Sequence, residues 1–146
     1  MWLLFFAIFV HAILAMFGVR WAYFSFVLLG LLYFPASVGF RLDPQPCELT
    51  FDMRLAVHSL TNYAHIVLFA FFFVMTSAQL RMSRWSDFAW ASMATIVMGV
   101  LVEVGEGVSG RGHCRLRDLI PDTVGSLLGS LIVVLKMRIL SRLRHF

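Results

Sequence analysis

Five long apolar runs constrain this chain more than any other feature of its sequence. They cover residues 2–18, 21–40, 60–80, 88–107 and 122–140. Each run is close to the length of about 20 residues that an α-helix needs to cross the hydrocarbon core of a bilayer. Because backbone polar groups in lipid must be paired within the segment, the runs predict helices. We therefore expect an all-α integral membrane protein, a compact bundle of five transmembrane helices.

The composition leaves little room for structure outside the membrane. Hydrophobic residues make up 60% of the 146-residue chain and charged residues 14%, whereas soluble domains carry about 25% charged residues. We expect one membrane domain over residues 1–146 and no separate soluble domain. The formal net charge is +4, but the basic residues lie in short clusters between the apolar runs. This pattern argues against nucleic acid as a partner.

The basic residues predict an orientation in the membrane. With five crossings, seven basic residues fall on one side and five on the other: Arg20, Arg81, Arg84, Lys136, Arg138, Arg142 and Arg144 against Arg41, Arg54, Arg111, Arg115 and Arg117. The richer side is predicted to be cytoplasmic. This places the N-terminus outside, the C-terminus inside, and the connections 41–59 and 108–121 on the outer face. The basic C-terminal segment is expected to bind the head groups of membrane lipids.

The connection 41–59 contains a candidate interfacial helix. In the stretch LTFDMRLAVHSL, the apolar side chains Leu49, Phe51, Leu55 and Leu60 could share one face, while Asp52 and Arg54 face water. Such a segment is typical of an amphipathic helix that lies in the membrane interface.

The two cysteines of the chain, Cys47 and Cys114, both fall on the predicted outer face. A compartment outside the cytoplasm permits a disulfide between them. The alternative is two unrelated thiols, because a disulfide requires a short distance between the two Cα atoms that sequence does not supply.

Two glutamates interrupt the fourth apolar run. Glu103 and Glu106 are three residues apart and project together from a helix, and carboxylates at membrane depth usually face the bundle interior and find partners. The other polar residues predicted at the outer ends of the third to fifth helices are Asn62, His65, Arg111, Arg115, Arg117, Asp118 and Asp122. These groups converge if the three helix ends meet. Gly125 and Gly129 favour that convergence, because a small-xxx-small pattern lets helices approach closely.

Three interpretations of this polar cluster stay open. The carboxylates and arginines could form a structural network that satisfies buried polar groups. They could instead bind a polar head group or substrate. The third interpretation is a metal site, because His65, Glu103, Glu106, Asp118 and Asp122 are suitable ligand types. Their spacing matches no compact metal motif such as HExxH, so we expect no metal and no cofactor.

The polar pattern resembles the signature of the VanZ-like family of small integral membrane proteins. In that family a helix carrying Glu and Gln is followed by an Arg-containing loop, and an Asp with an Asn four residues later opens a Gly-rich last helix. The matching positions here are Gly99, His65, Phe69, Glu103, Arg111, Asp118, Gly125 and Gly129. The resemblance covers residues 21–140 and implies a four-helix core, preceded by an additional transmembrane helix in residues 1–20.

Three positions depart from the family pattern. Glu106 stands where the family has Gln, Asp122 stands where it has Asn, and Tyr63 stands where Lys is common. The first two replacements make the cluster more acidic than the family pattern, and an ionised carboxylate accepts hydrogen bonds but cannot donate them. The resemblance implies a bacterial inner-membrane protein of the cell envelope. The family is named for a role in resistance to the glycopeptide teicoplanin.

These observations support three hypotheses for function. In the first, an outer-leaflet polar pocket binds a lipid-linked or glycan head group without turnover, with the arginines holding an anion and Glu103 and Asp118 positioning them. In the second, the protein is a membrane-embedded enzyme in which Glu103 or Glu106 acts as general acid or base on a lipid-linked substrate. In the third, it is a structural subunit of a larger membrane complex. We favour binding over catalysis.

Overall fold

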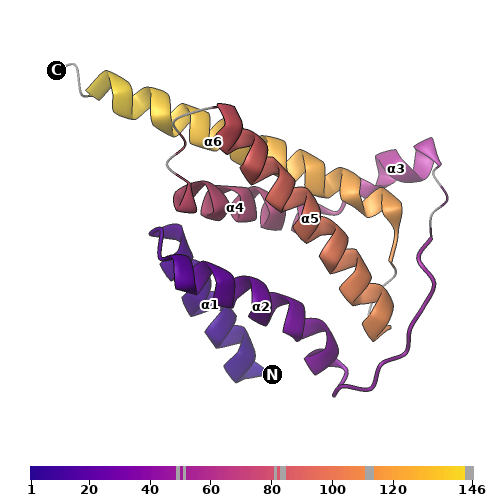
Figure 1. The fold of residues 1–146 in the computed structure, drawn as a ribbon. Coiled ribbons are helices and arrows are strands. Elements are labelled where there is room, and N and C mark those ends of the chain that lie inside the picture. Colours follow the sequence, from indigo (N-terminus) through magenta and orange to yellow (C-terminus); the bar gives the residue numbers. More distant parts are fainter. Residues whose placement is uncertain (49, 51, 81, 83–84, 111–113, 144–146) are drawn as a thin grey trace.

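The structure is a computed structural model that describes residues 1–48, 50, 52–80, 82, 85–110 and 114–143. The described residues form helices and contain no strand, apart from one isolated β-bridge between Glu48 and Arg115. In chain order the elements are α1 (Trp2–Met16), α2 (Arg20–Ser37), α3 (Met53–Ser59), α4 (Tyr63–Gln79), α5 (Trp85–Ser109), the 3-10 helix η1 (Leu116–Asp118) and α6 (Leu119–Leu143) (Figure 1). The all-α prediction is confirmed for these residues.

Two described helices are long and apolar enough to cross a membrane. They are α5, with 25 residues, and the continuous unit Leu116–Leu143, with 28. A third span is formed if α3 and α4, which bend by 67° at their junction, count as one. Helix α1 is apolar but has 15 residues, which reach about 22 Å against a hydrocarbon core of about 30 Å. Two or three crossings are therefore supported, and the predicted five are not confirmed.

The outer surface of the bundle is strongly apolar. Trp2, Leu3 and Trp85 are 85%, 86% and 90% exposed, and exposed Leu, Ile, Val and Phe residues occur on every long helix. Contiguous apolar surface of this extent is typical of contact with lipid or with other proteins. It agrees with the apolar composition and with a membrane location.

Helix packing is centred on α4. This helix makes its most extensive contacts with α6, and it also packs against α1, α2 and α5. Aromatic and small residues fill the space between α1, α2, α4 and α5, including Ala15, Phe26, Phe69 and Phe72. The core is therefore narrow, and most large side chains of the peripheral helices face outward.

Local chemistry explains where the elements begin and end. Gly18, with φ +80°, lies in the turn between α1 and α2, in a left-handed conformation that side chains with a Cβ disfavour. Asp52 caps α3 by accepting hydrogen bonds from the backbone N–H groups of Arg54 and Leu55, at 2.7 and 3.4 Å. Pro121 stands in the first turn of α6, where no intrahelical N–H bond is lost.

The elements carry the predicted outer connections to one end of the bundle. Figure 1 shows the turn between α1 and α2 and the C-terminal end of α6 at one end. The connection from α2 to α3, the end of α5 and the start of α6 lie at the opposite end. The described polar residues that line the connections at this second end include Asn62, Arg115, Arg117 and Asp118. Which side of a membrane it faces stays a prediction.

Candidate functional site

A disulfide joins the two long connections at the polar end of the bundle. Cys47 and Cys114 are bonded, with their Cα atoms 4.6 Å apart. Immediately after the bond the two segments pair through their backbones: Glu48 N–H donates to Cys114 O at 2.8 Å, and Leu116 N–H donates to Glu48 O at 3.1 Å. Because of this register, the side chain of Glu48 reaches the arginines that precede α6.

Glu48 is the partner that holds those arginines. Arg117 Nη1 donates to Glu48 Oε1 at 2.9 Å, and Arg115 Nε lies 3.6 Å from Glu48 Oε2, which is too long for a hydrogen bond. Arg115 Nε is buried and has no hydrogen-bond partner among the described residues. Glu48 therefore holds Arg117 by a hydrogen bond and Arg115 by a longer ion pair.

The two arginines line a polar cavity of about 220 Å³, which we call the arginine pocket. Its lining residues come from α3, the junction with α4, and η1 with the residue before it: Leu55, His58, Ser59, Thr61, Asn62, Arg115, Arg117 and Asp118. The wall is fixed in part by Ser59, whose hydroxyl lies 3.2 Å from Arg117 O. Asn62 is the residue before α4, and its side chain makes no capping hydrogen bond.

A second group of polar side chains lies inside the bundle, where α4, α5 and α6 meet. It consists of His65, Glu103 and Asp122, which we call the acid–histidine cluster. One candidate ligand atom from each residue lies within 4.8 Å of the others. His65 Nδ1 and Asp122 Oδ1 are 2.8 Å apart, and Glu103 Oε2 accepts a hydrogen bond from the backbone N–H of Arg115 at 2.7 Å. That last bond connects the cluster to the arginine pocket.

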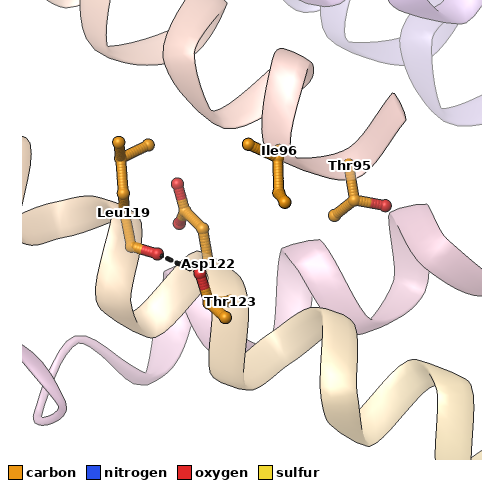
Figure 2. A pocket seen from close by; sticks show the side chains of 5 residues that line it. All are labelled: Thr95, Ile96, Leu119, Asp122 and Thr123. Carbon is orange, nitrogen blue, oxygen red and sulfur yellow. Dashed lines mark hydrogen bonds between the residues drawn. The ribbon is translucent and has the colours of Figure 1, made fainter. Parts of the chain in front are cut away.

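Each buried carboxylate in this cluster keeps one oxygen without a partner. Glu103 is 4% exposed and Asp122 is 3% exposed, yet Glu103 Oε1 and Asp122 Oδ2 have no hydrogen bond among the described residues. A cavity of about 10 Å³ adjoins Asp122 between α5 and α6. Figure 2 shows Asp122 pointing from α6 into this space, with Thr95 and Ile96 opposite on α5. A volume of about 10–15 Å³ holds one water molecule.

Glycines bring α6 close enough to α4 for the cluster to form. A Cβ placed on Gly125 would collide with the backbone oxygen of Ile66, and one placed on Gly129 would lie 2.6 Å from the backbone oxygen of Ala70. Both contacts are closer than real Cβ atoms make. At these two positions the absence of a side chain lets the backbones of α4 and α6 approach closely.

The structure divides the predicted polar residues between these two places. His65, Glu103 and Asp122 meet in the acid–histidine cluster, and Asn62, Arg115, Arg117 and Asp118 line the arginine pocket. Glu106 instead lies on the wall of an apolar cleft between the α1–α2 hairpin and helices α4 and α5. Arg111, together with Leu49 and Phe51 of the expected interfacial helix, lies outside the described residues.

Glu48 is the important residue that sequence reasoning missed. The sequence predicts that Glu103 and Asp118 position the arginines, but Glu103 binds only the backbone of Arg115, and the carboxylate next to the guanidinium groups is that of Glu48. A signal was present, because a bond between Cys47 and Cys114 places the next residue, Glu48, beside Arg115. His58, Ser59 and Thr61 were also missed as lining residues.

Comparison with known proteins found no relative of this chain. No protein-family model, curated protein or solved structure matches the chain.

Proposed function

We propose that the chain is a VanZ-like protein of the bacterial inner membrane that binds the phosphate-bearing head group of an envelope lipid with a net negative charge in the arginine pocket, without turnover. The observation that carries this proposal is the pair Arg115 and Arg117 on the wall of a polar cavity, where both guanidinium groups share the carboxylate of Glu48. Guanidinium groups present paired donors that match phosphate oxygens. We further propose that the N-terminus lies outside the membrane and the C-terminus in the cytoplasm, as the distribution of basic residues predicts.

The surroundings of the pocket favour a lipid over a soluble anion. Helix α3, which forms one wall, exposes Met53, Leu55 and Val57 at 68%, 44% and 60% of their surface. Its Asp52 cap and the neighbouring Arg54 are exposed polar groups. A short helix with exposed apolar and charged residues at the end of a membrane bundle is suited to the interface, where lipid head groups lie. Leu55 itself lines the pocket.

Glu48 pairs with the two arginines of the pocket, and a phosphate can replace its carboxylate. Its carboxylate oxygen Oε1 lies 2.9 Å from Arg117 Nη1, and its other oxygen, Oε2, lies 3.6 Å from Arg115 Nε. The side chain of Glu48 is 40% exposed, so its oxygens can return to water when a head group takes the guanidinium groups. The exchange substitutes one charge-assisted contact for another, and the backbone pairing of Glu48 with Cys114 and Leu116 is kept.

We expect Arg117→Gln to weaken binding of an anionic lipid by about tenfold or more. The reason is the loss of a charge-assisted hydrogen bond, which contributes about 1.5–3 kcal/mol. The measurement is native mass spectrometry of purified protein in a mild detergent, titrated with phosphatidylglycerol or with phosphatidylcholine of the same acyl chains.

The matched control is Arg41→Gln, which removes an exposed arginine outside the pocket. It should bind phosphatidylglycerol as the parent protein does. A further titration adds inorganic phosphate as a competitor of phosphatidylglycerol. Weak competition indicates that the pocket recognises the whole lipid. Complete displacement of the lipid by an equal concentration of phosphate indicates that the pocket binds a free anion. Equal retention of the two lipids, or an unchanged affinity in Arg117→Gln, would count against the proposal.

A further inference from the structure

The acid–histidine cluster gathers three metal-ligand side chains from three different helices. His65 comes from α4, Glu103 from α5 and Asp122 from α6, and their ligand atoms lie within 4.8 Å of one another. The three positions are separated by 38 and 19 residues in the chain, so they form no local sequence motif. The sequence contains suitable ligand types at these positions, and the packing of the helices selects these three and brings them together.

The carboxylates of the acid–histidine cluster make fewer hydrogen bonds than buried polar groups usually do. Glu103 Oε1 and Asp122 Oδ2 are buried without a hydrogen-bond partner among the described residues, and burial of an unpaired carboxylate oxygen is costly. When both carboxylates are ionised they carry two negative charges, against at most one positive charge on His65. Arg115 contributes its backbone N–H, not its guanidinium, to Glu103. A divalent cation supplies the missing positive charge and the missing partners at once.

We propose that His65, Glu103 and Asp122 bind one divalent transition-metal ion of the Zn²⁺ or Mn²⁺ class. One imidazole and two carboxylates suit these ions, which accept nitrogen and oxygen ligands at about 2.0–2.2 Å in the case of zinc. Three protein ligands leave a coordination position for water or for a ligand group, as in catalytic zinc sites.

A glycine lets the Asp122 carboxylate of the cluster lie close to α5. Gly99 lies one helical turn before Glu103, and a Cβ there would come within 2.8 Å of Asp122 Oδ2. The missing side chain is what lets the Asp122 carboxylate lie against α5. The cavity of about 10 Å³ beside Asp122 gives space for one water molecule next to the cluster.

One member of the cluster, His65, also borders an apolar cleft of about 530 Å³. This cleft lies between the α1–α2 hairpin and helices α4 and α5, and His65 and Glu106 belong to its wall together with Phe5, Phe26, Phe34 and Met98. His65 is thus shared between the buried cluster and the cleft. A molecule in the cleft would meet the cluster at His65.

Metal binding is tested on tag-free, chelator-washed protein, because a polyhistidine tag would itself bind the probe. Isothermal titration with Zn²⁺ and with Mn²⁺ should show one ion per chain, and the bound ion should remain after gel filtration, when it is counted by inductively coupled plasma mass spectrometry. We expect Asp122→Asn and His65→Ala to weaken the affinity by about 100-fold or more, since even changes outside the ligand set cost about 10–100-fold.

Matched controls remove the same chemical groups elsewhere. His11→Ala deletes a histidine that bonds its own helix at Ala7 O, and Asp87→Asn deletes a carboxylate in the first turn of α5. Both should keep the parent affinity. If a cluster variant folds poorly, the parent protein still decides the question, because binding to the folded state alone must raise its melting temperature as Zn²⁺ is added. No stoichiometric binding, or full affinity in Asp122→Asn, would overturn the proposal.

This inference is independent of head-group binding in the arginine pocket. Arg117→Gln should lose affinity for phosphatidylglycerol and keep its Zn²⁺ stoichiometry, because Arg117 is outside the ligand set. Asp122→Asn should lose Zn²⁺ binding and keep the parent affinity for phosphatidylglycerol. The two proposals can therefore fail separately.

Discussion

Gly125→Ala is expected to lower the free energy of unfolding by about 2–3 kcal/mol, although alanine is the better helix former. The added Cβ would collide with the backbone oxygen of Ile66 and lie 3.0 Å from the backbone nitrogen of Ala70. Backbone atoms cannot move aside as a flexible side chain does, so α6 must separate from α4. The measurement is reversible unfolding in mixed micelles, titrated with sodium dodecyl sulfate.

Gly30→Ala is the matched control for this substitution. Gly30 lies inside α2, and a Cβ at that position meets no atom within 4 Å. Its replacement should leave stability unchanged or raise it by up to about 1 kcal/mol through helix propensity. Equal effects of the two substitutions would show that α4 and α6 are not in close contact. Separation of α6 should also move Asp122 away from His65, so Gly125→Ala is expected to bind Zn²⁺ more weakly.

Removal of the disulfide is the second large effect. Replacing both Cys47 and Cys114 with Ser should cost about 2–4 kcal/mol, because the bond closes a loop across 67 positions of the chain and long loops gain most from closure. The same substitution should weaken head-group binding, since the bond adjoins the backbone pairing that sets the register of Glu48 against Arg115 and holds the two connections together there.

The control for the double substitution is the parent protein under reducing conditions. Dithiothreitol should lower the stability of the parent protein to that of the double variant and leave the variant itself unaffected. If reductant and substitution both leave the unfolding transition where it is, the bond between the two connections contributes nothing to the fold.

The helices could be predicted from the sequence because apolar length is a local property. The run 88–107 predicted most of α5, Trp85–Ser109, and the run 122–140 predicted most of α6, Leu119–Leu143. Both helices extend beyond their apolar runs, since backbone hydrogen bonding continues into polar residues at each end. Crossing number was harder to predict, because the apolar run 2–18 yields a helix of only 15 residues.

The site was predictable in composition but not in arrangement. The i, i+3 spacing of Glu103 and Glu106 suggested one common environment, yet the packing of α5 puts Glu103 in the cluster and Glu106 in the apolar cleft. Which carboxylate turns inward depends on the rotation of α5, which is set by tertiary contacts. The role of Glu48 depends on pairing between residues more than 60 positions apart, and the cysteines were its only local sign.

Photocrosslinking with a head-group-modified lipid tests head-group binding in the arginine pocket most directly. Phosphatidylglycerol carrying a diazirine on its head group is added to the purified protein, irradiated, and the labelled peptides are identified by mass spectrometry. We expect labels on α3, the junction with α4 and residues 115–118, and little label from the corresponding phosphatidylcholine probe. Labelling confined to the basic end of α6, around Arg138 and Arg142, or equal labelling by both probes, would contradict the proposed function.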